Sequence, residues 1–467
     1  MPAQGFAAAS RRLSGAAAGT SWLALPAAVQ RQAADLFLDT LAVIAAGSVH
    51  PSYAPFVAAH AHESGPCTVL GARTAGGAPA GTAALLNGGA TTVLQWQDGH
   101  RLARGHPASH LVPVLLALAE ERECAADEVM AAFVAGYEAG TRVGIALGGL
   151  QPLLHDGGTW ATLGAAVGAA KLLGGDAACL ANALEGAASV ATMPFRDTVS
   201  QGATVHHLYI GLGAAGALTV ARGAHAGMQA IPGTLEAFFG PRAGADFRPA
   251  ALLDGVGADD AWSRHELLQA YLKWHPVCAH FSGLAEALEL VVAGAAAHLG
   301  RAPRHEDVAG LEIALYSTAL GYDAPLPRTD LAARFSARAI AYAAFDPGGL
   351  HGDALARVAT PDSGARRWIS RVQVRHDPGL DAGYPAGRPA RVTLRLQDGS
   401  TGSAAVDDVY GDAARPLSDA DRASKAATAL ARRYGTGGAR AVRDAFHDWL
   451  GGAPIGRLGA ALRAPRR

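Results

Sequence analysis

The densest group of ionisable side chains lies in the segment QWQDGHRLARGHPASH, at residues 95–110. Its proton-exchanging and cationic residues are Asp98, His100, Arg101, Arg104, His106 and His110. Pro107 disfavours a helix before it, so His106 is expected in a turn. A loop with several histidines and arginines predicts an anion-binding site for acid–base chemistry. The alternative is a solvated surface loop.

A second candidate is the start of HDGGTWATLGAAVGAAKLL, where His155 and Asp156 precede a helix of small residues. Gly157, Gly158 and Thr159 leave the N-terminus of that helix open. Free backbone amides and the positive end of the helix dipole can hold a carboxylate there. The alternative is an ordinary glycine-rich connection in which Thr159 is the N-cap.

Two adjacent histidines, His206 and His207, precede another small-residue helix in TVHHLYIGLGAAG. The same stretch contains a GxGxxG pattern at Gly211, Gly213 and Gly216. This pattern indicates a dinucleotide-binding fold only when it closes a strand and opens a βαβ unit. The preceding strand is weak and no second strand follows, so we predict no dinucleotide fold and no nucleotide cofactor.

The fourth candidate, LKWHPVCAHFSG, groups Lys273, His275, Cys278 and His280 around Pro276. It lies where the spacing of apolar residues changes from a helical pattern to a mixture of helical and strand patterns. A lysine at a domain hinge that faces a cleft is well placed to bind an anionic substrate. Cys278 is expected to be structural, because nothing marks its thiol as activated.

The sequence predicts neither a metal site nor a serine nucleophile. His106 and His110 are four residues apart, but Pro107 lies between them and the glutamate of HExxH is missing. A convergence of His100, His106 and His110 on an ion stays open as an alternative. The chain has no GxSxG motif. A zinc ribbon and a disulfide framework are not expected from four widely spaced cysteines, Cys67, Cys124, Cys179 and Cys278.

The elements that position these segments are mostly helical. Apolar residues recur at helical spacing over residues 26–47, 81–94, 109–123, 126–147, 159–173, 176–192 and 211–225. After about residue 268, a strand-like alternation appears at 311–316, 368–374, 391–396 and 403–409. Helical patterns lie between these strands at 281–297 and 334–344, and the chain is helical again at 425–434 and 439–450. Val392, Leu394 and Leu396 should therefore face one side of a sheet.

This order predicts a mainly α fold: a large all-helical domain at 1–268, an inserted smaller α+β lid domain at 269–411, and C-terminal helices at 412–467 that return to the helical domain. A chain of 467 residues exceeds the roughly 250–300 at which single cores stop growing. With a net charge of −1, neither a nucleic-acid nor a membrane partner is expected. No stretch approaches the roughly 20 apolar residues of a spanning helix, and no secretory signal is evident, so we expect a cytoplasmic protein.

The four candidate segments, in this order, resemble the MmgE/PrpD family, which includes 2-methylcitrate dehydratase, cis-aconitate decarboxylase and iminodisuccinate epimerase. The most specific stretch is ALLNGGATTVLQWQDGHRLARGHPASHLVPVLLALAE. Further stretches that keep the family's order are DLFLDTLAVIAAG, HDGGTWATLGAAVGAAKLLG, HHLYIGLGAAGAL, LKWHPVCAHFSGLAEAL and RPLSDADRASK. The resemblance covers nearly the whole chain.

The resemblance implies a site in the cleft between the two domains, a homodimer, a small-molecule polycarboxylate substrate, and neither an organic cofactor nor a required metal. Carried over by position, the catalytic residues are Asp98, His106, His155 and Lys273. Further substrate-binding residues are expected at His100, Arg101, Arg104, His207 and His275. One histidine would exchange a proton at the carbon next to a carboxylate, and the developing charge would need fixed cations or N–H donors.

The chain departs from the family pattern at several of these positions. Gln97 and Gly99 replace an acid and a threonine on either side of Asp98. His206 stands where the decarboxylase has a lysine, and Ala339 stands where the family has a tyrosine. A lysine-to-histidine change replaces a permanent cation with a group that titrates near neutrality. This change weighs against cis-aconitate decarboxylation and favours His206 as a second catalytic acid–base group.

These observations predict a lyase, most simply a dehydratase, that removes a proton next to a carboxylate. An epimerase or isomerase that uses the same proton abstraction, and a decarboxylase, remain as alternatives. A catalytically silent binding protein is the alternative from a different class, since it would show the same substitutions. The joint retention of Asp98, His106, His155 and Lys273 argues against a silent protein.

Overall fold

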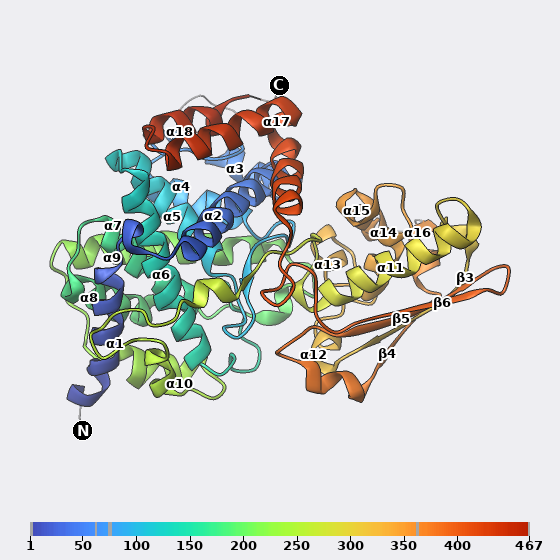
Figure 1. Ribbon diagram of the computed structural model, residues 1–467, viewed down its shortest axis with the longest axis horizontal. Coiled ribbons are helices and arrows are strands. Elements are labelled where there is room, and N and C mark those ends of the chain that lie inside the picture. Colours follow the sequence, from blue (N-terminus) through green and yellow to red (C-terminus); the bar gives the residue numbers. More distant parts are fainter. Residues whose placement is uncertain (1–2, 61–62, 73–76, 361–363, 466–467) are drawn as a thin grey trace.

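The computed structural model describes residues 3–60, 63–72, 77–360 and 364–465. One part of the molecule consists mainly of helices, and a four-stranded sheet with covering helices forms the other (Figure 1). The prediction of a mainly α fold with a smaller α+β domain is confirmed.

The helical domain comprises α1 (Ala3–Gly19), α2 (Ala27–Ser48), α3 (Ala54–Ala59), α4 (Ala80–Ala90), α5 (Pro107–Arg122), α6 (Ala126–Ala146), α7 (Trp160–Leu172), α8 (Ala177–Val190), α9 (Leu208–His225) and α10 (Gly240–Ala243). Two C-terminal helices, α17 (Asp419–Leu450) and α18 (Ile455–Arg463), pack on this domain beside the blue and cyan N-terminal helices (Figure 1). Phe446 and Trp449 of α17 contact the ring of Phe37 on α2, with centroids 6.0 and 5.7 Å apart.

The GxGxxG pattern lies inside α9 and not at the end of a strand. A Cβ atom on Gly211 would lie 2.4 Å from the carbonyl oxygen of Leu85, so the glycine permits α9 to pack directly on α4. The pattern therefore serves helix packing, in agreement with the expectation of no dinucleotide fold.

The α+β domain contains β3 (Val308–Leu315), β4 (Val372–His376), β5 (Ala390–Leu396) and β6 (Thr401–Val406), in the order β4-β3-β5-β6. Strand β3 pairs parallel with β4 and antiparallel with β5. Its helices are α11 (Ser282–Leu299), α12 (Ser317–Leu320), α13 (Asp330–Ala333), α14 (Ala337–Ala344), α15 (Ala354–Ala359) and α16 (Gly364–Ile369). Val392, Leu394 and Leu396 are buried while the residues between them are exposed, so the predicted one-sided burial of β5 is confirmed.

The predicted elements differ from the observed ones mainly at their ends. The strand expected at 368–374 begins only at Val372, because Trp368 and Ile369 belong to the end of α16. Helices α1 and α18 were not expected. The break predicted between 434 and 439 is present as a kink in α17, where Gly435 has the non-helical angles φ 71° and ψ 177°.

Two hydrophobic cores meet near the predicted hinge. The first contains Leu272 and Leu417, and the second contains Val199 together with residues from Val277 to Val406. The strand pair β1 (Gly99–His100) and β2 (Ala270–Tyr271) ties the first candidate loop to this hinge. The boundaries expected at 268/269 and 411/412 fall close to these changes of core and stay a prediction.

Among the described residues, one segment, Ala279–Leu299, is long and apolar enough by length and composition to cross a membrane. This differs from the expectation that no stretch approaches the length of a spanning helix. The segment contains α11, and its Leu284 and Leu288 are fully buried in the second core. A single helix of this kind is weak evidence for a membrane span, because a buried core helix passes the same test.

Candidate active site

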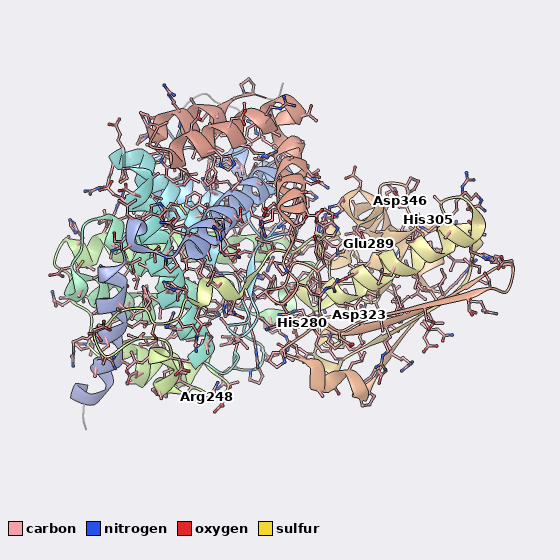
Figure 2. The ribbon with its side chains drawn as sticks, in the orientation of Figure 1. Arg248, His280, Glu289, His305, Asp323 and Asp346 are labelled. Carbon is pink, nitrogen blue, oxygen red and sulfur yellow. The ribbon has the colours of Figure 1, made fainter. Side chains whose placement is uncertain are left out.

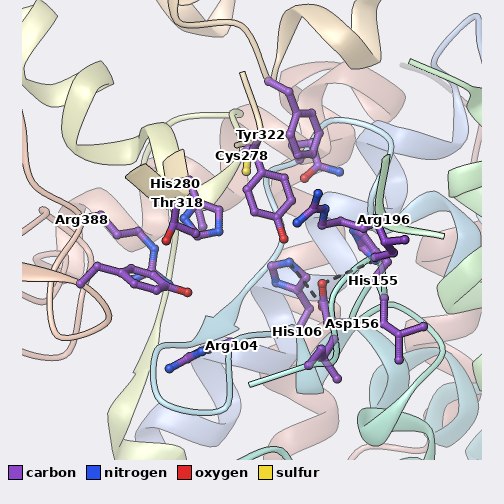
Figure 3. A pocket seen from close by; sticks show the side chains of 18 of the residues that line it. Arg104, His106, His155, Asp156, Arg196, Cys278, His280, Thr318, Tyr322 and Arg388 are labelled. Atoms are coloured by element: carbon purple, nitrogen blue, oxygen red, sulfur yellow. Dashed lines mark ion pairs between the residues drawn. The ribbon is translucent and has the colours of Figure 1, made fainter. Parts of the chain in front are cut away.

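A cavity of about 250 Å³ lies between the two domains. The helical domain contributes the polar lining residues Gln95, Arg104, His106, Gln151, His155, Asp156 and Arg196. The α+β domain contributes Cys278, His280, Thr318, Tyr322, Tyr384 and Arg388. Figure 3 shows His106 and Asp156 between Arg388 and His280 on one side and His155 and Arg196 on the other. The cavity thus combines acid–base groups with guanidinium groups.

Asp98 lies behind the cavity and holds the N-terminus of α5. Its fully buried carboxylate accepts hydrogen bonds from the backbone N–H groups of Ala108 and Ser109, at 3.1 and 3.2 Å, and from the Ser109 hydroxyl at 3.0 Å. Burial raises the pKa of Asp98 to about 6, although these hydrogen bonds oppose the rise. Asp98 therefore positions α5 from outside the cavity lining, and its predicted catalytic role stays a prediction.

The geometry of His106 determines which of its ring nitrogens faces the cavity as an acceptor. Its Nδ1 is 2.5 Å from the carbonyl oxygen of Asp98, and because a carbonyl only accepts, Nδ1 carries the proton. Its Nε2 is therefore the acceptor, 3.9 Å from a carboxylate oxygen of Asp156. Burial lowers the pKa of His106 to about 4, so the ring is neutral at pH 7. A neutral, oriented imidazole with a free Nε2 is suited to act as a general base.

His155 has the opposite tautomer. The backbone N–H of Gly157 donates to its Nδ1 at 2.9 Å, so the neutral ring carries its proton on Nε2. Burial lowers the pKa of His155, and the nearby Asp156 carboxylate, 3.5 Å from Nδ1, opposes this effect. Asp156 lies between the two imidazole rings, with its carboxylate oxygens 3.5 Å from Nδ1 of His155 and 3.9 Å from Nε2 of His106.

The N-terminus of α7 does not form the carboxylate site that the sequence suggested. The Gly157 N–H is occupied by His155, and the Gly158 N–H donates to Nε2 of His110 at 2.9 Å. His110 in turn donates from Nδ1 to the carbonyl of His106 at 2.9 Å. These hydrogen bonds link the two candidate loops, which is why the amides are unavailable for a substrate.

His206 and Lys273 lie next to the cavity but outside its lining. The ring centroids of His206 and His155 are 4.9 Å apart, and burial lowers the pKa of His206 well below its ordinary value. Lys273 is 3% exposed and its Nζ donates to the carbonyl of Gln95 at 2.9 Å. Burial lowers the pKa of Lys273 to about 8. Their predicted catalytic roles stay predictions.

Arg104 lines the cavity, whereas four other expected substrate-binding residues do not. Their side-chain pairs are His100–Glu266 at 3.6 Å, Arg101–Asp412 at 3.4 Å, His207–Ser52 at 3.4 Å and His275–Glu289 at 2.9 Å. These contacts give each side chain a structural partner away from the cavity. Their expected contact with substrate stays a prediction.

Several lining residues are not among the predicted catalytic and substrate-binding residues. His280 lies at the border between the domains (Figure 2), stacked on Tyr322 with ring centroids 4.7 Å apart. Tyr322 and Tyr384 bring phenol groups to the cavity, whereas Ala339 is buried in α14. Arg388 follows Tyr384 in a stretch without helical or strand periodicity, so no local signal marked it. Asp156 and His280 belong to segments that had been singled out as candidates.

The same geometry bears on the reactivity of Cys278 and on metal binding. Burial raises the pKa of the Cys278 thiol to about 11, in agreement with an unactivated cysteine. Within the described part of the chain, no group of three His, Cys, Asp or Glu residues is placed to hold a metal ion. A metal site that includes His110 is not formed, because both of its ring nitrogens are already hydrogen-bonded.

The structure is that of a two-domain protein with a cavity at the domain interface that is lined by histidine, carboxylate and arginine side chains. Residues 11–243 match the MmgE/PrpD N-terminal domain, and residues 275–450 match the MmgE/PrpD C-terminal domain. The chain belongs to the MmgE/PrpD family. It is also similar to the cis-aconitate decarboxylase-like protein oryM of Aspergillus oryzae (strain ATCC 42149 / RIB 40), with 35% identity over 162 residues. That match spans 32% of this chain and 33% of the relative.

Proposed function

We propose that this protein is a lyase of the dehydratase type that removes a proton next to a carboxylate of a small di- or tricarboxylate. The observation that carries this proposal is the orientation of His106. Its Nδ1 donates a hydrogen bond to the carbonyl oxygen of Asp98, which leaves Nε2 free as an acceptor. His106 lines a cavity that is also lined by His155 and three arginines. Family membership supports an enzyme that acts on small carboxylates.

The first step is proton transfer from the substrate carbon to Nε2 of His106. The electron pair of the broken C–H bond develops enolate-like charge next to the carboxylate. Such carbon acids are weak, so fixed cations close to the charge lower the barrier. Arg104, Arg196 and Arg388 line the cavity, and Lys273 lies next to it. These four side chains supply the positive charge.

Loss of water completes the reaction. The electron pair forms the C=C bond as the C–O bond breaks, and the proton held by His106 is returned to the leaving hydroxyl. His155 carries its proton on Nε2 and stabilises that hydroxyl by a hydrogen bond. Both histidines end the cycle neutral, which agrees with their lowered pKa values.

Epimerisation of a dicarboxylate is the second candidate. It is favoured by the presence of two neutral imidazoles of opposite tautomer in one cavity, because one can accept a proton while the other donates one. Decarboxylation is supported only by the name of the partly matching relative. A silent binding protein would not require His106 to be oriented with a free Nε2.

Proton NMR of the EDTA-treated protein in D2O separates these candidates. The substrates would be citrate, 2-methylcitrate, cis-aconitate, malate-like hydroxy acids and iminodisuccinate. A new vinyl signal from a hydroxy acid supports the dehydratase. Deuterium at one carbon without an alkene supports the epimerase instead. If every spectrum stays unchanged, the proposal of α-proton chemistry on these acids is refuted.

A further inference from the structure

His110 is a fully buried histidine with a hydrogen bond on each ring nitrogen. Its Nδ1 donates to the carbonyl oxygen of His106 at 2.9 Å, and its Nε2 accepts from the backbone N–H of Gly158 at 2.9 Å. A neutral imidazole has one donor and one acceptor, so a single tautomer satisfies both partners. Burial lowers the pKa of His110 to about 4, which keeps the ring neutral at pH 7. His110 therefore joins the loop of His106 to the loop of His155.

One end of this connection fixes the main chain of His106. His106 is the N-cap residue of α5, with φ −126° and ψ 75°. Its carbonyl oxygen accepts from His110, while its own Nδ1 donates to the carbonyl oxygen of Asp98. Because the main chain and the ring of His106 are both hydrogen-bonded, its free Nε2 has a fixed direction.

The other end fixes the loop that orients His155. The N–H of Gly157 donates to Nδ1 of His155, and the next N–H, that of Gly158, donates to His110. The carbonyl oxygen of Gly158 accepts from the N–H and the hydroxyl of Thr192, at 3.1 and 3.0 Å. Gly158 has a φ of +78°, and a Cβ atom there would overlap Oγ1 of Thr192, so the position requires glycine. The amide that sets the tautomer of His155 is thus held in place by the hydrogen bonds of the next residue.

The second glycine of the GxGxxG pattern permits the same contact from α9. A Cβ atom on Gly213 would lie 2.6 Å from Oγ1 of Thr162, 2.9 Å from Cα of Gly158 and 3.3 Å from Cδ2 of His110. A Cβ atom on Gly216, the third glycine, would have no atom of the described residues within 4 Å. The two glycines share one motif and one helix, but only Gly213 is needed for α9 to pack against His110 and Gly158.

We propose that His110, together with Gly213, positions His106 and His155 relative to each other. His110 lies outside the cavity lining, so it acts through these two histidines and not on the substrate. The catalytic consequence rests on the proposed function, which assigns proton removal to His106 and hydrogen bonding of the leaving hydroxyl to His155. A misplacement of about 1 Å in such a pair can lower the rate by about a hundredfold.

The ring tautomer of His155 tests this inference without requiring turnover. It is measured at pH 7 by 15N NMR of histidine-labelled protein, with the signal assigned from His155→Gln. His110→Phe removes both hydrogen bonds, His110→Gln places an amide near the position of Nε2, and His110→Asn places one near the position of Nδ1. Gly213→Ala displaces the backbone of Gly158 without changing a histidine.

Two matched controls separate positioning from a general loss of packing. His305→Phe removes a hydrogen bond from Nε2 to the carbonyl oxygen of Tyr342, at 2.9 Å, in the α+β domain and outside the cavity lining. Gly216→Ala makes the same change as Gly213→Ala, on the same helix, at an open position. Circular dichroism of each variant establishes that it is folded.

We expect His155 of the wild type to carry its proton on Nε2 alone. In His110→Phe, His110→Asn and Gly213→Ala it should populate both tautomers, because Gly157 is no longer held against Nδ1. His110→Gln should keep the wild-type tautomer, because its amide oxygen can accept from the N–H of Gly158. The value of kcat should fall by about tenfold to a hundredfold in His110→Phe while KM changes by less than about threefold. Both controls should match the wild type.

The inference is overturned if folded His110→Phe keeps the proton of His155 on Nε2 alone, or if His305→Phe changes the tautomer as much. If His110→Phe does not fold, Gly213→Ala decides in its place. Unchanged tautomers together with intact proton chemistry in D2O would refute the positioning role and leave the proposed function standing. Altered tautomers in a protein that changes none of the acids would support the positioning role and refute the proposed function.

Discussion

A buried ion pair connects the C-terminal helix to the segment that leads into the site. Lys425 of α17 lies with Nζ 2.7 Å from Oδ1 of Asp39 on α2. The same Nζ donates to the carbonyl of Trp96 at 3.2 Å, two residues before Asp98. The side chains of Lys425 and Asp39 are 0% and 5% exposed. We therefore expect Lys425→Met to leave an uncompensated carboxylate in the interior.

The size of the effect follows from burial. Removing one partner of a buried pair costs about 3–5 kcal/mol of the free energy of unfolding. Burial raises the pKa of Asp39 and Lys425 opposes the rise, so the pKa rises further in the variant. A carboxyl group with a raised folded-state pKa destabilises the fold as pH increases above its unfolded value of about 3.9. The loss changes by up to about 1.4 kcal/mol per pH unit, so it should be larger at pH 7 than at pH 5.

Urea unfolding followed by tryptophan fluorescence, at pH 7 and pH 5, measures this loss. The double variant Asp39→Asn/Lys425→Met should recover most of the stability and lose the pH dependence. Arg440→Met is the control, because Arg440 is exposed on α17, and it should change stability by less than about 0.5 kcal/mol. A loss below about 1 kcal/mol in Lys425→Met, or an equal loss at both pH values, would refute this reasoning.

Two further predictions concern the cavity. In a pH–rate profile, kcat/KM should stay level from about pH 7 to about pH 5 and fall near pH 4, because burial lowers the pKa of His106 to about 4 and only its neutral ring accepts a proton. A fall centred near pH 6.5 would contradict this assignment. Gly149→Ala would place a Cβ 2.5 Å from Nη1 of Arg104 at a φ of +105°. It should destabilise the protein by about 1–3 kcal/mol and raise KM more than it lowers kcat, whereas Gly456→Ala, at an open position, should leave both unchanged in melting and steady-state assays.

The helices were predictable because their signals are local. The helix predicted at 176–192 is present as α8, and the side chain of Asp176 caps it by accepting a hydrogen bond from the N–H of Cys179 at 2.9 Å. The alternation of β5 likewise predicted its buried face. Helix α1, whose sequence is rich in alanine and glycine, was not predicted. Its burial depends on packing against α8, which is far away in the sequence.

The site was predictable only in part, because its functional geometry is tertiary. The histidine-containing loops were recognisable from their local composition, and His106, His155 and Arg104 do line the cavity. Arg388 was not detectable, because its unpaired donors and its contact with Tyr271 exist only after the domains assemble. The partner of His100 could not be foreseen either, since Glu266 is 166 residues away.

The central claim is that His106 removes a proton from the carbon next to a carboxylate. The most direct test is the rate of deuterium incorporation at that carbon in D2O, compared between the wild type, His106→Gln and His225→Gln. His225 is exposed at the end of α9 and serves as the matched control. We predict that His106→Gln loses about 10²- to 10⁴-fold in exchange rate while it still binds dicarboxylates, and that His225→Gln is unchanged. Exchange within about threefold of the wild-type rate in His106→Gln would contradict the claim.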